Sequence, residues 1–245
     1  LKKVDAVINL AGEGIADGRW TPERKRVLIQ SRLLSARRLI DAISYMNNKP
    51  KVFLSASAIG FYGDQGDQLL NEESAKGDGF LAEVCQSWEN ETLKAKDFGI
   101  RTVALRIGMV LGHDGGALDK MLPPFQLGVG GKLGSGTQWM SWIHIHDLVE
   151  MMAFSIENPS VDGIYNAVSP NPVINSEFTK ILGQVLKRPT LFPAPKFILK
   201  IVLGELSELL LGSQRVMSKK ISDRGFKFIV RKKYTIGYSR TLHGF

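Results

Sequence analysis

The sequence predicts an α/β protein with a doubly wound parallel sheet and a small helical region at its C-terminal end. Short apolar runs rich in β-forming residues alternate with longer stretches of helical periodicity, which is typical of a parallel sheet covered by helices. The chain has 245 residues, of which 44% are hydrophobic, so it can bury the core of one large domain. After residue 175 helical periodicity dominates, which places the additional region late in the chain.

Four apolar runs are predicted as strands. Each is rich in β-branched or other apolar residues and is too short to form a typical helix. The strands are expected at residues 4–10, 52–57, 101–107 and 163–168. The last one is short and is expected to return to the same sheet.

Seven segments are predicted as helices. The first begins with Thr21 as N-cap and Pro22 at its first position, and its apolar residues recur at helical spacing. The second ends at Gly99, and the third is interrupted by Pro123 and Pro124. The helices are expected at residues 22–46, 80–98, 117–127, 147–156, 175–186, 196–211 and 216–221.

The carboxyl ends of the predicted strands carry small and polar residues. Ala11 and Gly12 follow the first strand, Ser57 ends the second, and Gly108 follows the third. Because ligands of doubly wound sheets bind beyond the carboxyl ends of the strands, we expect these residues to converge on one crevice. The sequence therefore predicts a small-molecule site at this edge of the sheet.

The composition argues against several function classes. Cys85 is the only cysteine, which excludes an intramolecular disulfide and a cysteine metal cluster and favours a cytoplasmic location. The net charge is +8, but the basic residues are spread over several segments without a nucleic-acid motif, so no specific nucleic-acid partner is expected. No apolar run approaches the ~20 residues of a membrane span, and no signal peptide is visible, so no membrane partner is expected.

Several segments, in the right order, resemble the extended short-chain dehydrogenases, in particular the atypical epimerase-family group. Residues 55–64 (SASAIGFYGD) are similar to the Ser and Tyr-Gly signature after the fifth strand of epimerases. The other similar segments are VINLAGE at 7–13, Arg19-Trp20, Ser31-Arg32, RIGMVLG at 106–112, GSG at 134–136, WIHIHD at 142–147 and NAVSP at 166–170. The segments LGE, GSQRV and GFKF, at 203–205, 212–216 and 225–228, resemble that group's C-terminal extension.

The resemblance implies a Rossmann-like fold and an NADP cofactor, with NAD as the alternative. It divides the chain into a partial NAD(P)-binding domain at residues 1–125 and a substrate-side loop and helical region at residues 126–245, whose strand at 163–168 returns to the sheet. It also implies cofactor contacts for eight residues, namely Asn9, Leu10, Ala11, Gly12, Ser31, Arg32, Ser55 and Arg106.

The glycine-rich turn of the family does not occur before the first strand of this sequence, which corresponds to the family's fourth strand. In the family, that turn holds the cofactor pyrophosphate against a helix N-terminus. Residues 12–14 (GEG) do not replace it, because they follow another strand and include an acidic residue. We expect either that the N-terminal unit lies outside this sequence or that the protein is truncated. Residues 229–245 are basic and also depart from the family's pattern.

A second departure concerns the family's catalytic pair, a Tyr followed four residues later by a Lys on one helix face. The Lys lowers the pKa of the Tyr, whose phenolate exchanges a proton with the substrate. Aligned on Glu89, which resembles the acidic residue after this motif, the two positions are Leu81 and Cys85. A shift of one residue gives Phe80 and Val84. Neither register contains an acid–base pair.

Three other residues are candidates for the chemistry. Ser57 stands where the family places its catalytic Ser, Tyr62 follows on the next loop, and His144 lies in a segment that the family places near its substrate. The alternative role for Tyr62 is to pack the crevice wall. His144 and His146 are expected on one face of a strand, but two histidines make a poor metal site, so no metal is expected.

The resemblance leaves two functions open. The first is an NAD(P)-dependent oxidoreductase or epimerase that acts on a sugar nucleotide or similar polar small molecule, with Ser57 aided by Tyr62 or His144. The second is a non-catalytic NAD(P)-binding sensor or scaffold that has lost the Tyr/Lys chemistry. The long helices at residues 22–46 and 80–98 are also suited to form the homodimer interface of related folds.

Overall fold

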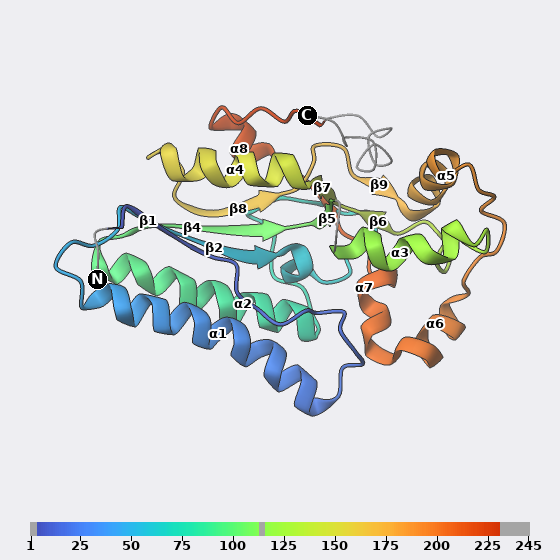
Figure 1. Cartoon of the computed structure of the whole chain (residues 1–245), viewed down its shortest axis with the longest axis horizontal. Coiled ribbons are helices and arrows are strands. Elements are labelled where there is room, and N and C mark those ends of the chain that lie inside the picture. Colours follow the sequence, from blue (N-terminus) through green and yellow to red (C-terminus); the bar gives the residue numbers. More distant parts are fainter. Residues whose placement is uncertain (1–3, 113–115, 231–245) are drawn as a thin grey trace.

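The computed structural model describes residues 4–112 and 116–230 and contains one main parallel sheet (Figure 1). Its strand order is β1-β2-β4-β8, and every neighbouring pair is parallel. The strands are β1 (Ala6–Asn9), β2 (Val52–Ala58), β4 (Arg101–Ile107) and β8 (Gly163–Ala167). The four predicted strands and the predicted fold class are therefore confirmed, with bounds that differ by a residue or two.

Helices cover both faces of this sheet, as a doubly wound fold requires. The helices α1 (Pro22–Ser44) and α2 (Phe80–Leu93) lie side by side on one face, and α4 (Ile145–Glu157) and α8 (Lys219–Asp223) lie on the other (Figure 1). Helix α1 begins as predicted, because the Thr21 side chain accepts a hydrogen bond from the Arg24 backbone N–H and Pro22 follows it.

The second half of the chain extends the fold at the carboxyl edge of the sheet. Three short pairs of strands form there: β5 (Met109–Leu111) with β7 (Trp142–His144), β6 (Trp139–Met140) with β9 (Val173–Ile174), and β3 (Leu69–Leu70) with β10 (Arg215–Val216). The helices of this part are α3 (Gly116–Gln126), α5 (Asn175–Leu186), α6 (Lys196–Leu203) and α7 (Glu208–Leu211). The division of the chain at residue 125 stays a prediction.

The predicted interruption of the third helix is wrong. Helix α3 runs through Pro123 and Pro124, although neither can donate a backbone hydrogen bond to the carbonyl four residues earlier. Its side chains Leu118, Leu122 and Phe125 are buried in one cluster with residues of α5. Burial of this apolar face therefore holds the helix together where its sequence propensity does not.

Two further predictions fail near the C-terminal end. Residues 196–211 do not form one helix, because Gly204 adopts a φ of +61° that ends α6, and a 3₁₀ turn (Gly204–Ser207) separates it from α7. The helix predicted at 216–221 begins only at Lys219, since Arg215 and Val216 pair with β3. Both differences arise from backbone geometry and distant pairing, which apolar periodicity does not report.

The central core lies between the sheet and α4. Its buried members include Leu54 and Val103 of the sheet, Met151 of α4, and Phe226 from the end of the described chain. Residues after α8 therefore contribute to the same core as the strands. Within residues 4–112 and 116–230, the structure contains no helix of the length and apolarity needed to cross a membrane.

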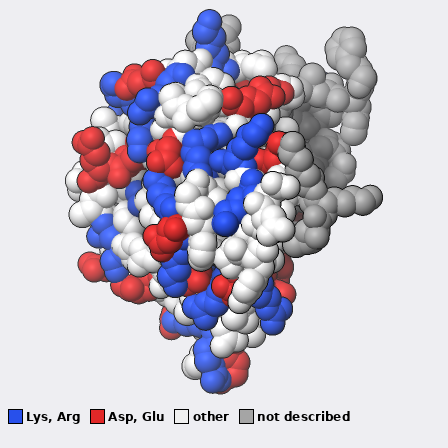
Figure 2. Space-filling model, turned by 90° about the vertical axis from the view of Figure 1, so that its left-hand side faces the viewer, with Lys and Arg blue, Asp and Glu red and all other residues white. Residues whose placement is uncertain are grey.

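The net charge of +8 is not gathered on the end face shown in Figure 2. On that face, acidic side chains are interspersed among the basic ones (Figure 2). A mixed face of this kind does not form the continuous basic surface that tracks a nucleic-acid backbone.

Candidate cofactor and catalytic site

The register of the sheet brings the predicted site residues to one edge. Asn9 at the end of β1 pairs with Ser55, and Ser57 at the end of β2 pairs with Arg106. Arg106 in turn lies beside Asn166 of β8. The polar side chains at the carboxyl ends of four neighbouring strands therefore form a stepped row, because Asn9 pairs with Ser55 and Arg106 pairs with Ser57 two residues further along β2.

Asn9 organises the first part of this row. Its Nδ2 donates to the Ser55 Oγ at 3.4 Å, and its Oδ1 accepts from the Ser35 hydroxyl at 2.7 Å. The same Oδ1 accepts from the backbone N–H of Ala11 at 3.3 Å. Because Asn9 is buried, these bonds satisfy its amide and fix the direction in which the chain leaves β1.

The segment after β1 is exposed but is tied to helix α1. The Ser31 hydroxyl accepts from the Glu13 backbone N–H at 3.1 Å, and Arg32 donates to the Glu13 carbonyl at 3.0 Å. A side chain at Gly12 would lie 3.2 Å from the Arg32 side chain, so glycine permits this close approach. Leu10, Ala11 and Gly12 are therefore exposed residues of an anchored segment, with Gly12 directly beside Arg32.

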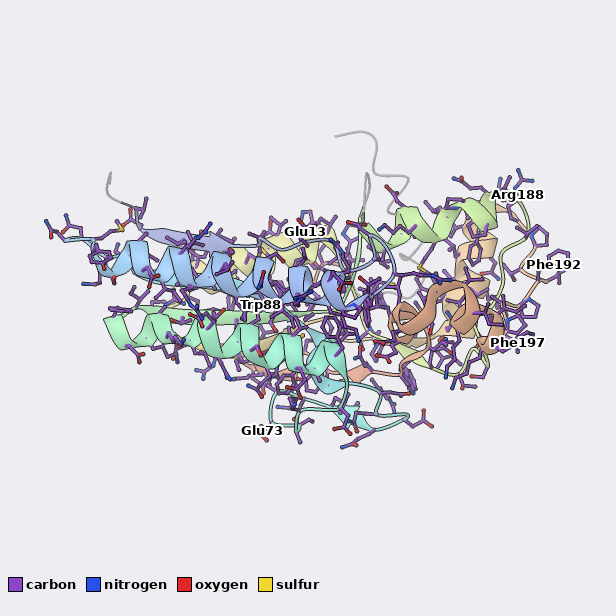
Figure 3. All side chains as sticks on the ribbon, turned by 90° about the horizontal axis from the view of Figure 1, so that it is seen from below. Glu13, Glu73, Trp88, Arg188, Phe192 and Phe197 are labelled. Atoms are coloured by element: carbon purple, nitrogen blue, oxygen red, sulfur yellow. The ribbon has the colours of Figure 1, made fainter. Side chains whose placement is uncertain are left out.

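Arg32 itself is held between α1 and α2. Its guanidinium lies 5.2 Å from the Trp88 ring centroid, and Trp88 lies between the two helices (Figure 3). One terminal nitrogen donates to the Leu28 carbonyl at 2.9 Å and the other to Glu13. A guanidinium has five N–H donors, so Arg32 keeps donors beyond these two bonds in a fixed orientation.

The centre of the edge is a buried ion pair between Arg106 and Glu89. The Arg106 Nε and one terminal nitrogen donate to the two carboxylate oxygens of Glu89, both at 2.8 Å, and both side chains are at most 3% exposed. The Ser57 hydroxyl donates to the same carboxylate at 2.7 Å. The bidentate pair therefore fixes the Glu89 carboxylate of α2, and this carboxylate orients the Ser57 hydroxyl.

Tyr62 belongs to the same network and is fully buried. Its hydroxyl donates to the Asn166 Oδ1 at 2.7 Å and accepts from Arg106 at 3.0 Å. Burial raises the pKa of Tyr62 above its ordinary value, although Arg106 and Asn166 oppose this effect. The Arg106 guanidinium also lies 3.4 Å from the Phe61 ring centroid. In this arrangement the hydroxyl of Tyr62 is fully occupied by protein groups.

The two alternative positions for the family's catalytic pair both lie on α2, and the structure distinguishes them. A side chain at Gly60 would meet the Leu81 Cβ at 3.1 Å and the Cys85 Sγ at 3.6 Å, so these two residues lie beside the turn that follows Ser57. Phe80 instead packs edge-on against Trp20 with centroids 5.1 Å apart. The register with Leu81 and Cys85 is therefore the one whose side chains face the edge of the sheet.

Cys85 does not replace the missing Lys. Its side chain is 3% exposed, and burial raises the pKa of the thiol to about 12, with the nearby Glu89 carboxylate adding to the shift. The thiol therefore stays protonated near neutral pH and carries no positive charge toward a neighbouring hydroxyl. Neither position of the pair contributes an acid or a base.

His144 lies outside this network and caps a helix. The expectation that His144 and His146 lie on one face of a strand is wrong, because β7 ends at His144 and α4 begins at Ile145. The His144 Nδ1 accepts from the His146 backbone N–H at 3.2 Å. Burial lowers the pKa of His144, although the Asp147 carboxylate opposes this effect. Among the described residues, His, Cys, Asp and Glu side chains nowhere gather in threes as metal ligands would.

A cleft of about 380 Å³ opens beside Leu81, between the start of α2 and helices α6 and α7. Its lining mixes the apolar side chains of Leu81 and Leu211 with charged side chains of both signs, from Asp64, Asp78, Lys196, Lys200 and Glu208. The cleft therefore offers a polar small molecule a place next to the position where the family has its Tyr.

The sequence did not lead us to predict that Glu89 joins Ser57 to Arg106 or that Trp88 contacts Arg32. Glu89 served only as an alignment landmark, although Arg106 in a buried strand requires an acidic partner somewhere in the chain. Trp88 was not singled out, and its contact with Arg32 joins two helices far apart in sequence. The signal for Glu89 was present in Arg106, whereas nothing local in the sequence indicates the role of Trp88.

Together, a parallel sheet with helices on both faces and a polar carboxyl edge define the Rossmann class of NAD(P)-binding folds. Comparison with known families agrees. Residues 1–168 match the NAD dependent epimerase/dehydratase family, and residues 194–231 match a domain of unknown function (DUF1731). The chain belongs to the NAD dependent epimerase/dehydratase family.

Individual relatives support this membership. The chain is 45% identical to the epimerase family protein SDR39U1 homolog, chloroplastic, of Arabidopsis thaliana over 91% of this chain and 64% of the relative. It is 39% identical to the epimerase family protein YfhF of Bacillus subtilis over 93% of this chain and 75% of the relative. The chain thus spans less than two thirds of the length of the Arabidopsis relative.

A solved structure shares nearly the whole fold. The human epimerase family protein SDR39U1 (isoform2), crystallised with NADPH, superposes with a TM-score of 0.90 at 32% identity. The match covers 98% of this chain and 81% of the human chain. The expected relationship to the epimerase-family group is confirmed.

Replacing Glu89 by Gln is expected to lower the free energy of unfolding by about 3–5 kcal/mol, because it leaves the Arg106 guanidinium buried without a counter-charge. Urea unfolding followed by circular dichroism measures the loss. The control is Asp223→Asn, which removes an ion pair with Lys219 in which both side chains are more than half exposed. This control is expected to cost less than about 1 kcal/mol. A Glu89→Gln cost as small as that of the control contradicts the role given to the buried pair.

Replacing His144 by Asn is expected to reduce the loss of stability in mild acid. Burial lowers the folded pKa of His144 below 6.5, so the unfolded state binds more protons. The stability contributed by neutral His144 is thus fully present above about pH 6.5 and is lost as the pH falls below it. Asn retains an N-cap acceptor without titrating. Thermal unfolding at about pH 7 and pH 5 measures the difference. Exposed His146→Asn is the control, and equal pH dependence in all three proteins contradicts the prediction.

Proposed function

We propose that the full-length protein binds NADP(H) across the carboxyl ends of β1 and β2. Family membership and the NADPH complex of the human relative support this proposal, with NAD as the alternative cofactor. The single observation that carries it is the exposed segment of residues 10–12 next to Arg32, whose guanidinium is oriented by Leu28, Glu13 and Trp88. These groups form a cradle for a polar, negatively charged ligand.

The eight proposed cofactor residues fall into two sets. Leu10, Ala11, Gly12 and Arg32 lie at or next to the exposed segment and are suited to direct contact. Asn9, Ser31, Ser55 and Arg106 are hydrogen-bonded within the protein and are suited to hold that segment and the edge of the sheet in place. The cofactor site therefore combines an exposed surface with a rigid support.

We further propose that the protein acts on a sugar nucleotide or a similar polar small molecule in the cleft beside Leu81. NADP(H), when bound, donates or accepts a hydride. Ser57 stands at the end of β2 with its hydroxyl oriented by Glu89, which is the arrangement that positions a substrate oxygen. The proton is exchanged with Tyr62 or His144. Transfer to Tyr62 requires its hydrogen bond with Asn166 to exchange for one with the substrate.

A non-catalytic NAD(P)-binding sensor or scaffold is the second candidate. The observation that favours it is the pair Leu81 and Cys85, which supplies neither a phenol nor a cation at the face of α2 next to Ser57. Under this function the buried network preserves the binding surface while the cleft performs no chemistry. The two candidates share the cofactor and differ in turnover.

A cytoplasmic location and a homodimer through α1 and α2 remain predictions of ours. Both helices also pack against each other on one face of the sheet, so an intermolecular contact would use their outer sides. The Arabidopsis relative is described as chloroplastic, and cell fractionation of the full-length protein distinguishes the two locations. A specific nucleic-acid partner is not expected, because no basic motif accompanies the charge.

Replacing Arg32 by Ala is expected to weaken NADPH binding at least tenfold, because it removes the oriented guanidinium beside the exposed segment. Binding to the full-length protein is measured by fluorescence, as energy transfer from tryptophan to the nicotinamide. Arg38→Ala is the control, since Arg38 is an exposed residue of the same helix. Its side chain makes no hydrogen bond or ion pair within the described chain. Equal affinities of the two variants contradict the proposed cofactor surface.

Replacing Ser57 by Ala is expected to reduce substrate-dependent turnover of NADPH by about 10²-fold or more, with cofactor affinity nearly unchanged. Absorbance at the nicotinamide band measures turnover over a panel of sugar nucleotides. Tyr62→Phe and His144→Asn identify the proton donor by which of them loses activity. If NADPH binds, no substrate in the panel is turned over and Ser57→Ala changes nothing, the sensor function replaces the enzymatic one.

A further inference from the structure

Helix α6 and the loop before it present an unusual apolar surface. No residue of α6 is buried, and four of its apolar side chains are exposed by 43–71%. The preceding loop adds two more exposed apolar side chains. We call this surface the α6 tip, and its apolar members are Leu191, Phe192, Phe197, Ile198, Ile201 and Val202. Figure 3 shows Arg188, Phe192 and Phe197 at the same end of the molecule.

The α6 tip is held in place by the rest of the fold. Arg19 donates to the carbonyls of Ile201 and Val202 at 2.6–3.0 Å. The start of the helix is fixed by a bridge between Leu133 and Ala194. Leu203, at the end of α6, packs against a buried cluster that includes Trp20 and Leu28. The exposure of its apolar side chains is therefore a property of an anchored helix and not of a frayed one.

The segment that forms the tip carries basic but no acidic residues, although its Lys196 and Lys200 also line the cleft that contains Asp64, Asp78 and Glu208. Residues 178–204 contain five Lys or Arg and no Asp or Glu. Lys187, Arg188, Lys196 and Lys200 are exposed, and none of them forms an ion pair within the part of the chain that the structure describes. By contrast, acidic and basic side chains alternate on the end face of Figure 2.

From this combination we infer that the α6 tip docks on a membrane surface that contains anionic lipids. A short helix with Phe and Ile on one side and Lys on its flanks lies at the interface of a bilayer, where the apolar side chains enter the acyl boundary. Lys and Arg beside it bind lipid phosphates, and their long stems follow the apolar surface. Several exposed apolar side chains on one anchored segment are typical of an interaction surface.

The same charges argue against a second copy of this chain as the occupant. A symmetric contact through the tip would bring two clusters of like charge together at close range. Docking of the α6 tip on a membrane differs from the expectation, drawn from hydropathy, that the protein has no membrane partner. Hydropathy addresses spanning segments of about 20 residues, whereas a peripheral helix inserts only its apolar face.

Co-sedimentation of the full-length protein with lipid vesicles tests the proposal. Vesicles of phosphatidylcholine alone are compared with vesicles in which about a third of the lipid is phosphatidylglycerol. We expect at least tenfold tighter binding to the anionic vesicles, and weaker binding at high salt because added ions screen the basic residues. Failure to bind anionic vesicles more tightly than neutral ones overturns the proposal.

Matched variants identify the surface. Phe197→Ser with Ile201→Ser, and separately Arg188→Glu, are expected to weaken vesicle binding at least tenfold, with unchanged NADPH affinity and thermal midpoint. Tyr45→Ser is the control, because Tyr45 is 88% exposed at the end of α1 that points away from α6 (Figure 1). The surface is wrong if Tyr45→Ser weakens binding as much as the tip variants do.

Two further outcomes assign the tip to another partner. Light scattering that detects a dimer, which the Phe197 and Ile201 variant loses while vesicles are not bound, assigns the tip to a second copy. Tighter binding to soluble polyglutamate than to anionic vesicles assigns it to an acidic protein. Either result overturns membrane docking while leaving the NADP(H) proposal intact, because cofactor binding is measured separately.

Discussion

The buried ion pair between Arg106 and Glu89 is the interaction on which the carboxyl edge of the sheet depends. An arginine inside a strand is tolerated only with a partner, because removing a lone charge from water costs several kcal/mol. Glu89 supplies that partner from α2 and orients Ser57 with the same carboxylate. Arg106 then fixes the Tyr62 hydroxyl. A single pair thus joins helix, strands and the following turn into one rigid edge.

The residues that hold the edge of the sheet in place are different from the residues at the positions of the family's acid–base pair. The face of α2 that carries Glu89 also carries Cys85 one turn earlier and Leu81 two turns earlier, at the positions that correspond to the family's acid–base pair. The fold can therefore keep its edge in place without a phenol or a lysine at those positions. The exposed segment beside Arg32 is anchored independently, through α1 and Trp88. The contacts that hold Arg32 and Glu13 are therefore different from the contacts that hold Ser57 and Tyr62.

Local patterns predicted most of the fold, and long-range contacts account for what they missed. The four strands and the two long helices follow from apolar periodicity and from the Thr21 cap, which are properties of neighbouring residues. The continuity of α3 through its prolines depends instead on burial against α5. Likewise, parallel strands predicted that polar residues meet at one edge, but not that Glu89 joins Ser57 to Arg106. His146 was wrongly expected on a strand, because β7 ends at His144 and α4 begins at the next residue.

Hydrogen–deuterium exchange of the full-length protein, with and without NADPH, tests the central claim most directly. The claim is that the cofactor lies over the exposed segment after β1 and its support on α1. We predict slower exchange on NADPH binding at residues 9–14, whose amides lie in that segment, and no change at residues 187–202, which form the α6 tip. NADPH binding without slower exchange at residues 9–14 would contradict the account, because the cofactor would then occupy a different surface.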